Sequence, residues 1–141
     1  MLDGTEPIAD GEELYRRIPI SNNWYDPATD SRPSPKAFRP HRADETGLSV
    51  FRAKYNTPDQ VAENERGSRY YIAVLRAGDL RANGLEVVPK AVPPDCPGHA
   101  EILSLTYENR RTAEAEGQQL LLAERLCVRI EGPFPEAKGN A

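Results

Sequence analysis

Arginine, serine and glutamate side chains near the expected strands have the chemistry to act on a phosphorylated sugar. Arg16 and Arg17 lie in an early strand, Ser49 lies in the next, and Glu63 and Glu101 lie in later elements. An arginine binds phosphate through paired hydrogen bonds, and a carboxylate stabilises the positive charge on a sugar carbon that loses its base. Neighbouring strand residues point to opposite faces, so only one of the two arginines can enter a given cleft. The alternative is that all five are ordinary solvated residues.

The stretch D-C-P-G-H-A-E-I-L raises a second possibility, because Cys96 and His99 have the spacing of half a zinc site. A closed structural zinc site needs about four ligands. The other candidates are Cys127, in an alternating segment, and His41, in a proline-rich loop. A nucleophilic Cys–His pair is also conceivable, but the intervening proline and glycine favour a turn. We therefore expect a turn and no metal site.

A long irregular segment runs from Ser21 to about Thr46 and is rich in proline, asparagine, aspartate and serine. Proline lacks an N–H group and short polar side chains compete with the backbone ladder, so neither a helix nor a central strand can run through it. Two interpretations stay open for its large side chains: they anchor the loop on the core, or they form a contact surface for a partner. These side chains belong to Trp24, Tyr25, Phe38 and Arg39.

Alternation and end signals predict an α+β fold whose sheet is mainly antiparallel or mixed, with about five to six strands. Two helices and the long proline-rich loop complete it. Thr57 and Gln60 predict a capping box at the first helix, and Asp79 is expected to cap one further helical turn that Gly84 closes. Expected strands cover residues 14–20, 48–53, 70–76, 85–89, 98–105 and 126–131, and expected helices cover 58–65 and 111–124.

Composition limits the functional classes. The 141 residues include 18 Lys and Arg against 22 Asp and Glu, a net charge of −4, which argues against nucleic acid as the main partner. No apolar run approaches the roughly 18 residues of a membrane span, and the acidic start is unlike a secretory signal. We expect one cytoplasmic domain over residues 1–141 with free thiols, a flexible N-terminus to about residue 11, and a flexible tail from about residue 133.

Three segments together resemble RES-type toxins and their ADP-ribosyltransferase-like relatives: L-Y-R-R-I, L-S-V-F-R-A-K-Y-N-T-P-D-Q-V-A-E and Y-Y-I-A-V-L-R. The resemblance covers residues 14–76. It implies that Arg16 or Arg17 binds NAD, that Phe51 forms a wall for nicotinamide, and that Glu63 is catalytic. The segment G-H-A-E-I-L is similar to the glutamate-bearing strand of other ADP-ribosyltransferases, which implies Glu101 instead.

The whole chain also resembles small uncharacterised bacterial proteins that begin with L-Y-R-R-I and carry a late P-x-H-A turn, a likeness that implies no activity. Two functional hypotheses follow. The first is a bacterial partner-binding or accessory protein without catalytic activity or cofactor, which contacts another protein through residues 21–46. The alternative is an ADP-ribosyltransferase-like enzyme that processes NAD, as a toxin or conflict-system effector.

Overall fold

The computed structural model describes residues 4–20, 23–28, 32–64, 67–91 and 97–135. Its centre is one sheet of 6 strands in the order β4-β5-β2-β1-β3-β6, and every neighbouring pair is antiparallel. The predicted α+β class with a mainly antiparallel sheet is confirmed. The strands are β1 (Glu13–Pro19), β2 (Leu48–Arg52), β3 (Tyr70–Arg76), β4 (Val87–Pro89), β5 (His99–Ile102) and β6 (Arg129–Phe134).

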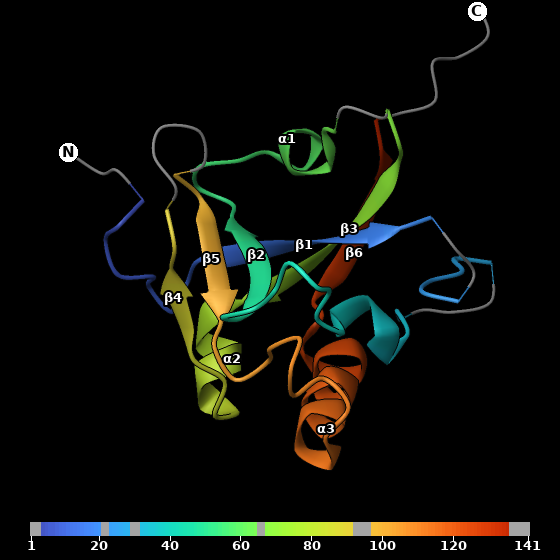
Figure 1. Cartoon of the computed structure of the whole chain (residues 1–141). Coiled ribbons are helices and arrows are strands. Elements are labelled where there is room, and N and C mark those ends of the chain that lie inside the picture. Colours follow the sequence, from blue (N-terminus) through green and yellow to red (C-terminus); the bar gives the residue numbers. More distant parts are fainter. Residues whose placement is uncertain (1–3, 21–22, 29–31, 65–66, 92–96, 136–141) are drawn as a thin grey trace, which may run out of the picture.

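Helices cover both faces of the sheet (Figure 1). The short α1 (Pro58–Ala62) lies on one side, and α2 (Ala77–Ala82) and α3 (Ala113–Leu121) lie on the other. A 3-10 turn, η1 (Pro35–Phe38), forms inside the proline-rich loop, and a π-helical turn, η2 (Leu122–Leu126), extends α3. None of the described helices is both long and apolar enough to cross a membrane.

The helix ends follow the predicted caps only in part. Thr57 and Gln60 form both hydrogen bonds of the predicted capping box on α1. The predicted Asp79 cap of α2 is wrong: β3 runs directly into this helix, so Arg76 is the N-cap and Asp79 lies in the first turn. A carboxylate there still suits the positive end of the helix dipole. Gly84 follows the helix with φ of +80°, a conformation that favours glycine.

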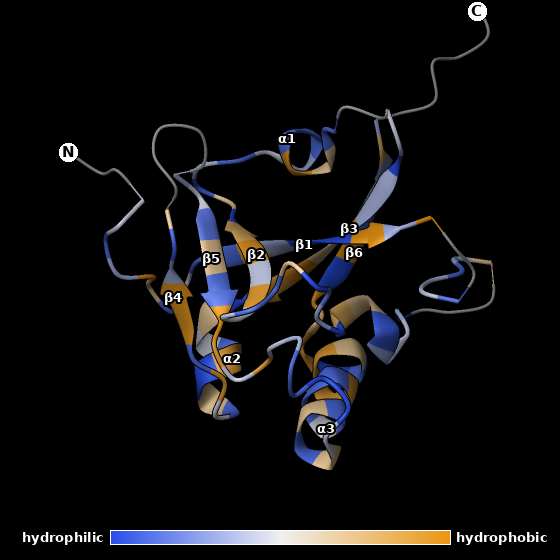
Figure 2. Cartoon of the chain, viewed as in Figure 1, coloured by the Kyte–Doolittle hydropathy of each residue, from blue (hydrophilic) through white to orange (hydrophobic). Residues whose placement is uncertain are grey.

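Two apolar clusters fill the two faces of the sheet. The larger lies against α2 and α3 and takes every second residue of the central strands, including Leu14, Ile18 and Val50. The smaller lies under α1 and includes Tyr15 and Ile72, with Phe51 packed beside them. Apolar and polar residues accordingly alternate along β2 and around α3 (Figure 2). The alternation fixes which side chains face each side of the sheet.

The last strand differs from its prediction. We expected Leu126, Val128 and Ile130 to point inward from a strand over residues 126–131. Leu126 is buried and Ile130 packs on the larger cluster, as expected. Leu126 nevertheless ends the π-helical turn and Val128 is 39% exposed, because the helix continues further than its composition indicated. The strand β6 then runs through Pro133 to Phe134, where a proline is tolerated because β6 is an edge strand. The rest of the expected tail, residues 136–141, lies outside the described part.

The segment assigned to a flexible N-terminus contacts the sheet extensively from residue 4 onward. Ile8 is buried in the larger cluster. The fully buried Arg52 donates to both carboxylate oxygens of Glu12, at 2.9 and 2.8 Å, and to the backbone carbonyl of Glu6 at 2.9 Å. A guanidinium Nη2 also lies 3.0 Å from the Glu6 carboxylate. This group fixes the described part of the segment before β1.

Candidate functional site

Backbone pairing between β1 and β2 stops early. It includes only Leu14 with Arg52 and Tyr15 with Phe51. Beyond that point the guanidinium of Arg16 bridges the two elements instead, since its Nη1 donates to the Ser49 carbonyl at 3.0 Å. Its Nε donates to the carbonyl of Ala37 in η1 at 3.2 Å. Arg16 therefore takes the place of backbone pairing between the two strands at this point.

Arg17, Ser49 and Glu101 lie in one row across β1, β2 and β5. Ser49 pairs directly with Glu101, and the β1–β2 ladder, continued in register, would set Arg17 opposite Ser49. Their neighbours in each strand belong to the larger core cluster, so all three point to the face that carries α1. We call these residues the Arg17 row. Three of the five residues that the sequence singled out therefore point to the same face of the sheet.

Glu101 is held against the backbone at the start of β2. It is only 7% exposed, and its Oε1 accepts a hydrogen bond from Thr46 Oγ1 at 2.7 Å. A Cβ at Gly47 would lie 2.9 Å from the Cβ of Glu101, so only glycine leaves enough room at this position. The carboxylate is therefore fixed in position within the row.

A histidine orients the hydroxyl group of the row. His99 Nδ1 lies 3.0 Å from the carbonyl of Lys90, and its Nε2 lies 3.1 Å from Ser49 Oγ. A carbonyl only accepts, so Nδ1 carries the proton in the neutral ring, and Nε2 accepts from the serine hydroxyl. The lone pairs of Ser49 Oγ therefore remain available as acceptors. The ring of Phe51 lies 5.7 Å from that of His99 and continues the wall.

The two arginines of β1 have different surroundings. Arg16 is buried, and its burial, with a contribution from the positive charge of Arg17, lowers its pKa to about 10. Arg17 lies half-buried over the ring of Tyr70, with the guanidinium carbon 5.0 Å from the ring centre. Both line a cavity of about 160 Å³ with Pro19, His41 and Tyr70, which we call the Arg16 cavity. In β1, Arg16 points to the face that carries α2 and α3, and Arg17 points to the face that carries α1.

A second cavity of about 310 Å³ shares His41 with the first. We call it the basic cavity. The ring of His41 stacks on Trp24, with centres 5.5 Å apart and an angle of 28°. Burial and the positive charges of Arg16 and Arg17 lower the pKa of His41, against the opposing effect of Asp44. The basic cavity is lined by Trp24, Lys36, Arg39, Pro40, His41, Arg42, Tyr107 and Arg110.

The four loop residues singled out in the sequence divide between core and cavity. Phe38 is fully buried, and Tyr25 packs edge-on against Tyr71 with ring centres 4.9 Å apart. Both hold the loop on the larger core cluster. Trp24 and Arg39 are half-buried and line the basic cavity. Of the four residues, these last two line a cavity.

Glu63 lies apart from the row. It is the exposed C-cap of α1 and lines a separate cavity of about 280 Å³ with Asp59 and Gln60. The helix α1 packs on β1, β3 and β6, whereas Glu101 belongs to β5 on the other side of β2. The two glutamates therefore cannot be interchangeable members of one site.

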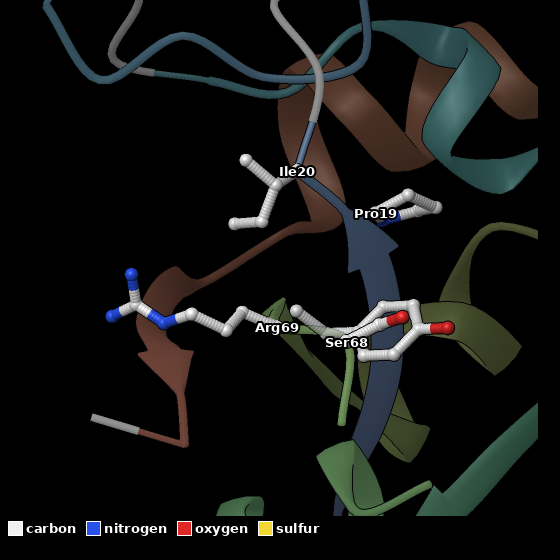
Figure 3. Close-up of a pocket in the computed structure, with 5 residues that line it drawn as sticks. Pro19, Ile20, Ser68 and Arg69 are labelled. Carbon is white, nitrogen blue, oxygen red and sulfur yellow. The ribbon is translucent and has the colours of Figure 1, made fainter. Parts of the chain in front are cut away.

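A cavity of about 450 Å³ lies where β1 ends and β3 begins (Figure 3). Its lining consists of Pro19, Ile20, Ser68, Arg69 and Tyr70. The side chain of Arg69 extends away from Pro19, and its Nε donates to the carbonyl of Pro135 at 2.8 Å. No carboxylate, histidine or thiol lines this cavity, so it carries no catalytic arrangement.

The proposed zinc ligands do not gather in the described part of the chain, where no three His, Cys, Asp or Glu side chains are close enough to hold a metal ion. Cys96 lies outside the described residues. Cys127 is buried, and burial raises the pKa of its thiol. His99 is bonded to backbone, as its turn position indicated, but its second partner, Ser49, was not predicted from the sequence. His41 and Tyr70 were also missed, because no spacing in the sequence links them to Arg16 and Arg17.

Comparison of the chain with family models, curated proteins and solved structures finds no match. The fold and site therefore define the class: an α+β protein with a six-stranded antiparallel sheet, a short β1–β2 pairing, and a small cationic cavity beside the end of β1. The resemblances noted in the sequence stay predictions.

Proposed function

We propose that the protein is an NAD-processing enzyme of the ADP-ribosyltransferase-like type, with the Arg17 row as its site. The observation that carries this proposal is the alignment of Arg17, Ser49 and Glu101 on one face, beside the point where β1 and β2 stop pairing. The enzymatic hypothesis requires an arginine and a glutamate on the same face of the sheet. Because Arg17 and Glu101 meet this requirement, we prefer the enzymatic hypothesis to the partner-binding one.

Each member of the row fits one requirement of the reaction. The bond between nicotinamide and ribose breaks with its electron pair going to the ring nitrogen, which leaves positive charge on the ribose carbon. The fixed carboxylate of Glu101 stabilises that charge and takes the proton from the attacking hydroxyl or water. Arg17 binds the phosphates and the lone pairs of Ser49 accept an N–H of the nicotinamide amide. Phe51 supplies a flat wall for the ring.

The test is release of nicotinamide from NAD, followed by chromatography for the wild type, Glu101→Gln and Glu63→Gln. We expect Glu101→Gln to lower turnover by about 10²- to 10³-fold, because an amide cannot stabilise the positive charge or accept the proton. Gln keeps the oxygen that accepts from Thr46, so the fold is retained. Glu63→Gln is the matched control and should remain active. Absence of turnover in the wild type, without any thermal shift on adding NAD, would reject the proposal.

The second candidate function is binding of a partner protein through residues 21–46, without catalysis. Its supporting observation is that Trp24 and Arg39 present half-buried side chains at a cavity rather than packing fully into the core. Trp24→Ala combined with Arg39→Gln should then release any protein that co-purifies with the wild type. Retention of that protein by the double variant would exclude this function for the loop.

A further inference from the structure

The basic cavity gathers positive charge in a protein that is negative overall. Four of its lining residues, Lys36, Arg39, Arg42 and Arg110, are permanently charged, and no carboxylate lines it. The chain as a whole carries a net charge of −4. Grouped like charges repel one another and attract an anion. The lining therefore has the charge of an anion site.

These cations have no acidic partners in the described part of the chain. The ion pairs found there use the cations of Arg52, Lys54, Arg76, Arg81 and Arg129. None uses a cation of the basic cavity. Acidic residues are abundant in this chain, yet none of them lines this cavity or forms an ion pair with its cations in the described part of the chain.

Arg39 adds a second, independent observation. Its Nε is buried and finds no acceptor among the described residues. A buried donor without an acceptor is costly, and nearly all such groups in proteins are hydrogen-bonded. The same side chain lines the basic cavity. An oxygen-rich ligand would supply acceptors to this guanidinium.

Aromatic rings give the cavity flat apolar walls beside its charges. Trp24 stacks on His41, and the guanidinium carbon of Arg110 lies 3.6 Å from the ring centre of Tyr107. Arg110 also donates to the Tyr107 carbonyl, which fixes the planar group in place. Flat rings bind a planar base, whereas fixed guanidinium groups bind phosphate oxygens. The volume of about 310 Å³ is that of a small-molecule site.

We propose that the basic cavity binds a nucleoside phosphate, with its base against Trp24 and Tyr107 and its phosphates against the arginines. This site goes beyond the proposed enzymatic function, because it contains no residue of the Arg17 row. A free nucleotide and the nucleotide half of a larger dinucleotide share this chemistry. ADP and NAD as separate probes distinguish the two sources.

The experiment measures binding of ADP, inorganic pyrophosphate, adenosine and NAD to the full chain by titration calorimetry. We expect ADP to bind more tightly than pyrophosphate, and adenosine to bind weakly, since base and phosphates both contribute. NAD also binds at the proposed Arg17 row, so NAD is compared in the wild type and in Arg42→Gln with Arg110→Gln. NAD affinity that falls in the double variant would identify a dinucleotide as the source, and unchanged NAD affinity with weakened ADP binding would identify a free nucleotide. Absence of ADP binding at about 1 mM would overturn the proposal.

Variants locate the bound ligand. Arg42→Gln with Arg110→Gln should weaken ADP and pyrophosphate about tenfold or more, because charged donors to phosphate are lost. Trp24→Leu should weaken ADP but leave pyrophosphate unchanged. Arg111→Gln, at an exposed arginine next in sequence to Arg110 and outside the lining, is the matched control. Equal ADP affinity in the wild type and the correctly folded double variant would overturn the site.

The outcome is separable from that of the proposed enzyme. Glu101→Gln should bind ADP as tightly as the wild type, because Glu101 does not line the basic cavity. Loss of nicotinamide release in that variant with unchanged ADP binding supports both proposals. Nicotinamide release that survives in the arginine double variant, together with lost ADP binding, would support two independent sites.

Discussion

Arg52 in β2 and the cations of the basic cavity, which lie outside the strands, show how similar side chains are fully partnered in one place and without ion-pair partners in another. Arg52 is fully buried and its guanidinium donates to Glu12 and to backbone carbonyls of the N-terminal segment. The cations of the basic cavity have no carboxylate partner in the described part of the chain. The difference teaches that an arginine whose N–H groups and charge have partners within the protein stabilises the fold, whereas an arginine without such partners is available to a ligand.

The Arg52 group should give the largest effect on stability. Arg52→Met leaves the partly buried carboxylate of Glu12 and three backbone carbonyls without their donor, so we expect a loss of about 3–5 kcal/mol in the free energy of unfolding. Arg76→Met is the control, because the 53% exposed Arg76 pairs with Glu13 at 3.9 Å and should contribute at most about 1 kcal/mol. Urea unfolding measures both. Similar losses for both variants would contradict the comparison.

Acid should weaken the same group without any mutation. A hydrogen bond from Lys54 lowers the pKa of Glu6 to about 2. Burial opposes ionisation of Glu12, but the hydrogen bonds from Arg52 and the Ala9 backbone and the positive charges of Arg52 and Lys54 together outweigh this effect and lower its pKa. Both carboxyls bind protons more weakly when folded. Their contribution is therefore complete above the ordinary pKa of 4.5 and is lost as the pH falls towards about 2.

Urea unfolding at a series of pH values measures how the free energy of unfolding falls below pH 4.5, and we call this part of the curve the acid limb. In Lys54→Met the pKa of Glu6 should rise, so the unfolding free energy that this carboxyl contributes becomes smaller and the acid limb shallower. Lys90→Met, at an exposed lysine that forms no ion pair in the described part of the chain, should keep the wild-type limb. Identical limbs in the wild type and Lys54→Met would show that Glu6 does not contribute.

Arg16 is intermediate in character between Arg52 and the cations of the basic cavity. Its guanidinium donates to two backbone carbonyls, but it forms no ion pair in the described part of the chain. Arg16→Met removes the donor to Ala37 and Ser49 carbonyls, and we expect a loss of about 1–3 kcal/mol. Arg17→Met, the neighbouring arginine that lies over Tyr70, should lose about 1 kcal/mol or less. Thermal and urea unfolding compare the two. A larger loss of unfolding free energy in Arg17→Met than in Arg16→Met would indicate that Arg17 is the structural arginine and Arg16 the site residue.

The cations of the basic cavity should give the smallest effect. Arg42 is exposed and forms no ion pair in the described part of the chain, so Arg42→Gln should change the unfolding free energy by no more than about 0.5 kcal/mol. The same variant weakens the proposed nucleotide binding. A destabilisation above about 1 kcal/mol would place Arg42 with the structural arginines instead.

Local signals in the sequence were enough for most of the elements. The capping box of Thr57 and Gln60 depends on contacts three residues apart, so it was predictable. The alternation of Leu48, Val50 and Arg52 likewise gave the buried face of β2, although the reason for burying Arg52 was not visible. The last strand was placed too early, because the continuation of α3 into a π-helical turn depends on packing against the core.

The sequence by itself determined the α+β class and the side of each strand that faces the core, because these depend on periodicity and short-range caps. It left a mixed sheet open, and the tertiary structure decided that every strand pair is antiparallel. The sequence also supplied Arg17, Ser49 and Glu101 as candidates. Only the tertiary structure decided that these three share a row, that Glu63 lies elsewhere, and that His41 joins two cavities. Register between distant strands and the path of a long loop arise from packing across the whole domain, which no local spacing encodes.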